Sequence, residues 1–529
     1  MEVLRARADA RLEVTFEHVA LGGGRRLDWR VWNPGTEPVR IEQIAIEFSA
    51  APDMVLEHGW QSWSVVRRCA PDDARPERKE AAEWGRSTHA ADPDGLGEVV
   101  TGDQFLLTDV GLVGFLEGSR HLSTVEVRGD VVSAVALLDG VELAPGATRS
   151  LDPIWFSDAA PGDAYSEYAS LWGAASAARV GAVAPVGWCS WYQYFGEVTP
   201  GVIRSNLAAA AAAGLDLVQI DDGYQRSVGE WLEVSDDWAV PMADVAAEIA
   251  ATGLAAGIWT APFLVADGGP IATEHPDWLV THRSGHPLRA MFNPAWGGWA
   301  LALDTTHPEV LAHLTQTFAA LRAMGFGYHK IDFCYAAAMP GHRHDATLTR
   351  AQALRAGLDA VRAGVGDDAF LLGCGCPFGP AVGVVDAMRV SADVAPTWLP
   401  AASWPGLEEA APAARNAVQA SVLRAPLHRR VFLDDPDCLL LRPDALTGEQ
   451  RDVLAAAIAG SGGFTVVSDD LGAYGDAEWA ALAEAGRLAA LGDSVLDIVD
   501  PFAMPVVVRG DSLQLEVDWT IPSATIVER

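Results

Sequence analysis

The sequence has no long hydrophobic run, because charged residues, glycine or proline interrupt every candidate stretch. A helix that crosses a bilayer needs about 20 mostly apolar residues, so we expect no membrane span and no membrane partner. Residues 1–14 are charged and contain neither an apolar core nor a small-residue cleavage site. We therefore expect no secretory signal and a cytoplasmic location.

Positive charge is scarce: Lys and Arg number 37 against 71 Asp and Glu, a formal net charge of -34. So acidic a surface repels nucleic acid and anionic membranes, and we expect no nucleic-acid partner. It also disfavours a phosphorylated substrate and favours a neutral one. Solubility alone would explain the acidity equally well.

Cysteines are few, six in 529 residues, and they are scattered through the chain. Several lie in apolar runs typical of buried strands, so we expect free buried thiols rather than a disulfide framework. The pair in Cys374-Gly-Cys376 lacks zinc-site spacing and has no nearby partner pair.

Metal and nucleotide motifs are also missing. The acidic runs 434–437 (DDPD) and 468–470 (SDD) lack EF-hand spacing and a histidine set, so we interpret them as strand-end turns. Gly22-Gly23-Gly24 opens no βαβ unit, and no G-x-S-x-G elbow occurs.

Residue alternation in the first part of the chain is typical of strands. Segment 26–32 alternates polar and apolar side chains, the period of a half-buried strand. Similar short runs recur, with glycine and proline between them, to about residue 156. We predict an N-terminal antiparallel β-sandwich over residues 1–160 and a linker helix within residues 161–182.

A different pattern begins at residue 183, where short apolar runs alternate with alanine-rich helical stretches. Such alternation predicts βα units and a parallel sheet, and eight units make a (β/α)8 TIM barrel, here residues 183–475. The eight runs are 183–191, 215–222, 255–262, 328–333, 370–375, 387–393, 430–437 and 464–470. Residues 476–529 predict a helix and a small C-terminal β domain. The predicted fold class is multidomain α/β.

Two carboxylates stand at predicted strand ends, where barrel enzymes carry their active sites. Asp332 shares a strand face with Lys330, an ammonium that would keep a carboxylate nucleophile ionised. Asp393 shares a face with Arg389 and Ser391. Retaining glycosidases need two carboxyl groups about 5–5.5 Å apart. Ion pairs that close strand ends are the structural alternative for both.

Asp221 and Asp222 end the second run, where adjacent carboxylates would accept hydrogen bonds from sugar hydroxyls. The alternative is turn formation, because Asp-Gly is a common turn pair.

Aromatic side chains accompany these carboxylates. Trp188, Trp191 and Tyr192 on the first run, with Trp259 on the third, offer flat faces for sugar rings, and core packing is the alternative for each. Segment 57–64 of the sandwich (EHGWQSWS) is predicted either to wall the barrel mouth or to pack between domains.

Motifs along most of the chain resemble glycoside hydrolase family 36, the α-galactosidases or melibiases, within the clan of retaining α-galactosidases. They are 58–63 (HGWQSW), 187–192 (GWCSWY), 220–225 (IDDGYQ), 257–262 (GIWTAP), 330–332 (KID), 373–375 (GCG) and 389–393 (RVSAD). Each lies at a predicted strand end or loop, and their order matches the family's.

The resemblance implies a double displacement without metal or organic cofactor. Asp332 would attack the anomeric carbon, and Asp393 would protonate the leaving oxygen and then deprotonate water. Substrate binding is implied for Asp221, Asp222, Trp191, Tyr192, Trp259, Lys330, Cys374, Arg389, Trp60 and Trp63. The family's usual substrates are α-galactoside oligosaccharides of the melibiose or raffinose type.

Two departures from the family's pattern lie beside the site. Gln193 stands where close relatives are expected to have histidine, and Ser391-Ala392 replaces a Gly-Pro pair. These residues put the substrate in question more than the mechanism. We make no prediction of the oligomeric state.

Other functions remain open alternatives. An α-N-acetylgalactosaminidase or a galactosyltransferase would use the same chemistry. A non-catalytic sugar-binding barrel is disfavoured by intact Asp332 and Asp393. A metal-dependent hydrolase would use the aspartate clusters and lose its activity in EDTA.

Overall fold

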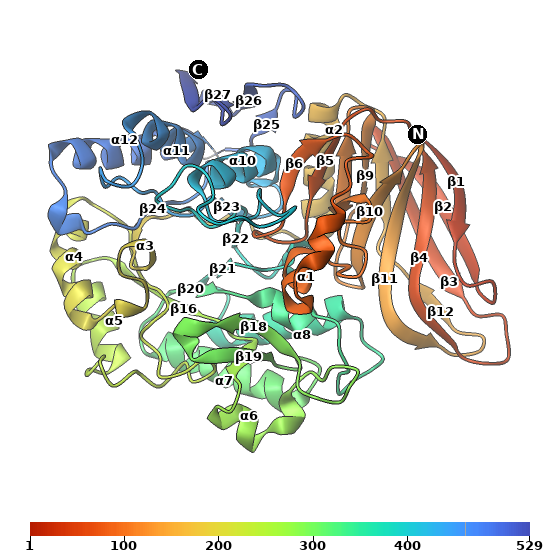
Figure 1. The fold of residues 1–529 in the computed structure, drawn as a ribbon, viewed down its shortest axis with the longest axis horizontal. Coiled ribbons are helices and arrows are strands. Elements are labelled where there is room, and N and C mark those ends of the chain that lie inside the picture. Colours follow the sequence, from red (N-terminus) through yellow and green to blue (C-terminus); the bar gives the residue numbers. More distant parts are fainter. Residues whose placement is uncertain (461, 493) are drawn as a thin grey trace.

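The computed structural model describes residues 1–460, 462–492 and 494–529. They form an N-terminal β domain, a central barrel and a small C-terminal β sheet (Figure 1). The predicted multidomain α/β fold class is confirmed.

The N-terminal domain is one almost entirely antiparallel sheet whose parts face each other across a shared core. Alternation builds it: in β3, Leu27, Trp29 and Val31 are buried and the residues between them exposed. The strands are β1 (Glu2–Arg7), β2 (Glu13–Leu21), β3 (Gly24–Trp32), β4 (Val39–Ser49), β5 (Val55–His58), β6 (Val66–Cys69), β7 (Val100–Asp103), β8 (Phe105–Thr108), β9 (Gly111–Phe115), β10 (Leu122–Arg128), β11 (Val131–Leu143), β12 (Thr148–Ser150) and β13 (Ile154–Ser157).

The central domain is a ring of parallel strands, and each of the eight predicted runs contains one of them. They are β14 (Val186–Cys189), β15 (Leu217–Ile220), β16 (Ala255–Thr260), β20 (Tyr328–Ile331), β21 (Phe370–Gly373), β22 (Ala387–Arg389), β23 (Leu433–Asp435) and β24 (Thr465–Val467). A bond of 3.2 Å from the Phe464 N–H to the Asp434 carbonyl and the bridge between Leu439 and Val467 close the ring. Burial on both faces explains why most residues of these runs are apolar.

Helices alternate with the barrel strands, and local capping fixes where they begin. Thr199 caps α4 by accepting the Val202 N–H, and Thr349 and Gln352 form a capping box on α8. The helices are α1 (Glu83–His89), α2 (Pro161–Ala175), α3 (Trp191–Tyr194), α4 (Pro200–Ala212), α5 (Met242–Ala251), α6 (Pro270–Glu274), α7 (Pro308–Ala323), α8 (Arg350–Val365), α9 (Phe378–Ala381), α10 (Ala414–Arg424), α11 (Gly448–Gly460) and α12 (Asp476–Gly492).

An insertion over residues 261–307 separates the third and fourth barrel strands on the catalytic face of the barrel. It contains the sheet β17 (Leu264–Ala266), β19 (Gly298–Ala302) and β18 (Arg289–Asn293), in that order. A short 3-10 helix, Pro294–Trp296, joins β18 to β19. The hairpin lies next to α1 of the N-terminal domain (Figure 1).

Four antiparallel strands follow α12: β25 (Asp497–Ile498), β26 (Val506–Arg509), β27 (Leu513–Asp518) and β28 (Ser523–Glu528). Helix α2 joins the domains, since Tyr168 donates to the Phe115 carbonyl of β9 at 2.6 Å. All six cysteines are described, buried and free, which confirms the expectation of unpaired thiols. In the part of the chain that is described, no helix is long and apolar enough to cross a membrane.

Candidate active site

Asp332 lies directly after β20, at the carboxyl end of the fourth barrel strand, and is 5% exposed. Its Oδ2 accepts the Trp259 indole N–H at 3.0 Å, and its Oδ1 accepts the Phe333 N–H at 2.8 Å. Phe333 takes up a left-handed backbone conformation, φ 52°, which ends the strand. Two hydrogen bonds of this kind hold the carboxyl group in one orientation.

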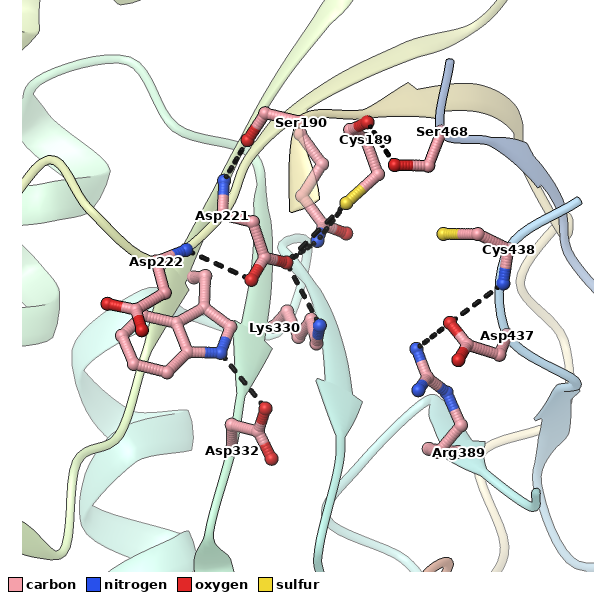
Figure 2. Close-up of polar contacts among 12 residues, drawn as sticks. Cys189, Ser190, Asp221, Asp222, Lys330, Asp332, Arg389, Asp437, Cys438 and Ser468 are labelled. Carbon is pink, nitrogen blue, oxygen red and sulfur yellow. Dashed lines mark hydrogen bonds and ion pairs between the residues drawn. The ribbon is translucent and has the colours of Figure 1, made fainter. Parts of the chain in front are cut away.

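Lys330 pairs with Asp221 rather than with Asp332. The Nζ–Oδ2 distance is 2.9 Å, and both side chains are buried (Figure 2). Burial lowers the pKa of Lys330, but nearby negative groups, Asp221 first among them, raise it, and the net direction is well above the ordinary value. Lys330 lies near enough to Asp332 to feel its charge, but the ion-pair partner of Lys330 is Asp221, which follows a different strand. Alternation within one strand cannot reveal such a partner.

Asp221 is held by its own neighbours as well as by Lys330. The Gln219 amide donates to Oδ2 at 2.5 Å, and the Asp222 N–H donates to Oδ1 at 2.9 Å (Figure 2). The Ser190 hydroxyl accepts the Asp221 N–H at 3.0 Å. The Asp-Gly sequence does form a turn, but Asp221 also belongs to a charged network beside Asp332.

Asp222 carries a hydrogen bond that the sequence did not reveal. The Trp296 indole N–H donates to its Oδ2 at 2.7 Å, and the Gln225 amide donates to its Oδ1 at 2.5 Å. Burial raises the pKa of Asp222, and these two donors act against that rise. Trp296 also packs against Trp259 and Phe333, with ring centroids 6.2 and 5.2 Å away. It thereby links the insertion to the residues that hold Asp332.

Asp393 lies beyond β22, and at 34% side-chain exposure it is the more accessible of the two candidate catalytic carboxyl groups. The Trp63 indole N–H donates to Oδ1 at 2.9 Å, and Arg389 Nη1 lies 3.4 Å from the same oxygen. Burial raises the pKa of Asp393. Arg389 lowers it, the charge of Asp332 raises it, and the Trp63 hydrogen bond lowers it; the net direction is upward.

Strand β22 ends at Arg389, earlier than the predicted run, so alternation does not continue to Asp393. The Ser391 hydroxyl turns away and donates to the Pro436 carbonyl at 2.9 Å. Arg389 and Asp393 still meet, because the chain after the strand bends back toward the guanidinium. The predicted shared face was therefore wrong for Ser391.

Arg389 is fixed by two further aspartates (Figure 2 labels the second). Its Nε donates to Asp435 at 2.9 Å, and its Nη2 lies 2.8 Å from Asp437. Asp437 also accepts the Tyr192 hydroxyl and the Val394 N–H. Burial raises the pKa of Asp437 to about 6. The run 434–437, interpreted from sequence as a turn, is thus part of the site wall.

The sandwich loop, segment 57–64, both walls the site and packs between domains, so each of the two predicted roles applies. The Gly375 N–H donates to the Ser62 hydroxyl at 3.2 Å, and Trp63 reaches Asp393. Trp60 is 4% exposed, and its indole donates to the Thr88 carbonyl at 3.0 Å. It therefore supports the loop from the domain interface instead of joining the aromatic residues around Asp393.

Helix α1 and helix α10 hold the loop in place. The His89 Nδ1 lies 2.8 Å from the Trp63 carbonyl oxygen, and the Gln61 amide donates to the Thr88 carbonyl at 2.7 Å. From α10, Arg424 donates to the carbonyls of Gly59 and Gln61 at 3.2 and 3.3 Å.

The remaining predicted residues lie around the same strand ends. Cys374, after β21, donates its N–H to the Ile331 carbonyl at 2.8 Å, and burial raises the pKa of its thiol well above normal. Trp191 is partly exposed and packs edge-on against Phe195 at 5.2 Å. Trp188 is fully buried, with its N–H on the Asp469 carbonyl, so core packing is its role.

The arrangement provides two carboxyl groups in different environments. Asp332 is buried and receives two hydrogen bonds, whereas burial raises the pKa of Asp393. One group suits attack as a carboxylate and the other suits proton transfer. Among the described residues, no group of three or more His, Cys, Asp and Glu side chains is arranged to hold a metal ion.

Comparisons with known proteins find similarity to α-galactosidases. Residues 181–358 match the family model described as Melibiase. TtGalA, an α-galactosidase from Thermus thermophilus solved in complex with p-nitrophenyl α-D-galactopyranoside, is 27% identical with a TM-score of 0.73. That match covers 94% of this chain and 97% of the other.

Two further relatives are more distant. The α-galactosidase AgaA of Geobacillus stearothermophilus, solved with stachyose as a family 36 enzyme, is 15% identical with a TM-score of 0.66 over 96% of this chain and 72% of that one, which supports the fold. In sequence, AgaA is 27% identical over 141 residues, 25% of this chain and 18% of AgaA. The bifunctional α-galactosidase/sucrose kinase of Mediterraneibacter gnavus is 26% identical over 108 residues, 19% of this chain and 12% of that protein.

The barrel fold and the comparisons together make the chain similar to enzymes of the glycoside hydrolase class. More narrowly, its residues 181–358 are similar to the melibiase family, and the whole chain is similar to the α-galactosidase TtGalA.

Proposed function

We propose that the protein is a retaining α-galactosidase that removes terminal α-D-galactosyl residues from neutral oligosaccharides such as melibiose or raffinose. The observation that carries this proposal is the different environment of two carboxyl groups, Asp332 after β20 and Asp393 after β22, at the same end of the barrel. The likeness to an enzyme solved with an α-galactoside supports the choice of sugar.

In the first step, a carboxylate oxygen of Asp332 attacks the anomeric carbon while Asp393 donates its proton to the departing glycosidic oxygen. The products are a galactosyl ester on Asp332 and the free leaving sugar. In the second step, Asp393 takes a proton from water as the water oxygen attacks the anomeric carbon. The ester bond breaks, and both carboxyl groups return to their starting states.

The walls of the site serve binding and orientation. Asp221, Asp222 and Lys330 present charged groups to sugar hydroxyls beside Asp332, and hydrogen bonds to charged groups are the stronger kind. Trp259 and Trp296 offer ring faces next to these charges. We assign the enzyme to the cytoplasm, where six unpaired thiols stay reduced.

The proposal is tested by a substrate panel. We expect cleavage of p-nitrophenyl α-D-galactoside, and turnover at least about a hundredfold lower on the α-D-glucoside and the α-N-acetylgalactosaminide, because a site built for particular hydroxyls rejects analogues that leave them unpaired. Proton NMR of the first-formed galactose would show the α-anomer. Preferred cleavage of another glycoside would refute the choice of sugar, and β-galactose would refute retention.

The indole of Trp63 should tune the pH profile. Because its hydrogen bond lowers the pKa of Asp393, Trp63→Phe should raise that pKa further. A general acid is active only while protonated, so the alkaline limb of kcat/KM should move to higher pH. Trp296→Phe is the matched control, since it removes an indole N–H from Asp222 and leaves that limb in place. A limb that stays put in Trp63→Phe would contradict this role.

A further inference from the structure

Residues of α1 and of the β18–β19 hairpin line a groove outside the catalytic carboxyl pair. The two elements lie side by side (Figure 1). Its volume is about 490 Å³. A second cavity of about 540 Å³ shares Glu83, Ser87, His282 and Pro340 with it, so the two form a continuous groove along α1. Sites for small ligands typically measure about 300–1,000 Å³.

The groove contains two partly exposed tryptophans. Trp84 of α1 and Trp299 of β19 meet edge to face, with centroids 6.3 Å apart and planes at 85°. Neither indole N–H has a hydrogen-bond partner within the described ranges of the chain. Such rings combine an apolar face with a free donor at the edge. A sugar ring, with its C–H face and its hydroxyl oxygens, complements both features.

Polar groups of both signs surround these rings. Arg289 lies over Trp299 at 5.0 Å and is 3.3 Å from Asp267. On the other side, His282 is 3.5 Å from Glu83. Exposed pairs of this kind add little to stability, and their remaining lone pairs and N–H groups stay available to a ligand. The balance of signs favours a neutral, hydroxyl-rich ligand over an anion.

Helix α1 connects the groove to the catalytic site. Trp84 lines the groove, whereas Thr88 and His89 hold the loop whose Trp63 donates to Asp393. Trp296, which donates to Asp222, lies three residues before Trp299 on the same hairpin. A ligand in the groove would therefore contact the two elements that carry Trp63 and Trp296.

We propose that this groove is an accessory binding site for neutral oligosaccharides, which holds sugar units distant from the bond that is cleaved. Trp84 and Trp299 supply the stacking surface, and Arg289, Asp267 and Glu83 bind hydroxyls. The choice of an α-galactoside as ligand rests on the proposed function, but the carbohydrate chemistry of the groove does not.

Stachyose is the probe, titrated calorimetrically into Asp332→Ala so that turnover does not interfere. Adding Trp84→Ala or Arg289→Ala should raise its dissociation constant at least about fivefold, while that of galactose, which needs only the catalytic pocket, should stay the same. Arg289 is 56% exposed, so its replacement tests the site without disturbing the core. Trp32→Ala, at a tryptophan 39% exposed on the sandwich, is the matched control and should change neither constant.

Equal stachyose affinity in all variants would overturn the accessory site. Equal weakening of stachyose and galactose would also overturn it, because the residues would then act through the catalytic pocket. Failure of the proposed function would appear differently: the wild type would not cleave p-nitrophenyl α-D-galactoside, whereas stachyose binding would still depend on Trp84 and Arg289.

Discussion

Asp332→Ala should reduce kcat on p-nitrophenyl α-D-galactoside by a factor on the order of 10⁴ or more, since losses of this size follow removal of a nucleophile. The alanine leaves space at the end of β20 between Trp259 and Phe333, and azide should enter it. Azide would attack the anomeric carbon from the side that Asp332 occupied, and the leaving group would depart in one inversion. The expected product is β-galactosyl azide, identified by NMR.

Asp222→Ala is the matched control for this experiment. It removes another buried aspartate of the same site, one that is held by Trp296 and Gln225. We expect it to weaken binding and turnover without rescue by azide. Rescue at Asp222 instead of Asp332, or activity in Asp332→Ala within tenfold of the wild type, would show that the nucleophile has been misassigned.

Asp393→Ala should produce a loss that depends on the leaving group. Melibiose needs proton donation to its departing oxygen, so kcat/KM on it should fall about 10²–10⁴-fold, the usual contribution of general acid–base catalysis. The p-nitrophenolate group leaves without much help, so kcat/KM on that galactoside should fall far less. The alkaline limb of the pH profile should disappear, because the group whose pKa sets it is gone.

Azide separates the two carboxyl groups by stereochemistry. In Asp393→Ala the galactosyl ester on Asp332 still forms, and azide attacks it from the opposite face, so α-galactosyl azide is expected. The opposite anomer, or an equal loss on both substrates, would contradict the acid/base assignment. Asp435→Asn removes the charge of a carboxylate that pairs with Arg389, at a residue that does not contact Asp393. This variant should retain the alkaline limb.

Much of the barrel can be predicted from local patterns of apolar and polar residues in the sequence. Strands covered on both faces need mostly apolar residues, as in β15, where Leu217, Val218 and Ile220 are buried. Polar residues directly after such runs lie at the catalytic face by topology alone. For this reason Asp221, Asp222 and Asp332 were found from sequence, and Asp393 was found although the strand ends four residues before it.

Contacts between distant segments have no such local signature. Trp296 lies in an insertion 74 residues from Asp222 along the chain, and no periodicity marks the bond between them. The pairing of Lys330 with Asp221, across 109 residues, was likewise absent from any strand alternation. Sequence alone also left Trp60 and Trp63 equivalent, whereas the fold directs one indole to Thr88 and the other to Asp393.

The repeat of apolar runs, and the polar residues that follow them, were therefore enough to predict a barrel and to name its candidate carboxylates. The tertiary structure decided which groups meet: Arg389 with Asp435 and Asp437, the sandwich loop with the barrel, and α1 with the inserted hairpin. The physical reason is range. Hydrophobic periodicity reports burial within one element, but hydrogen bonds and ion pairs reach only a few ångströms and depend on where separate elements finally pack.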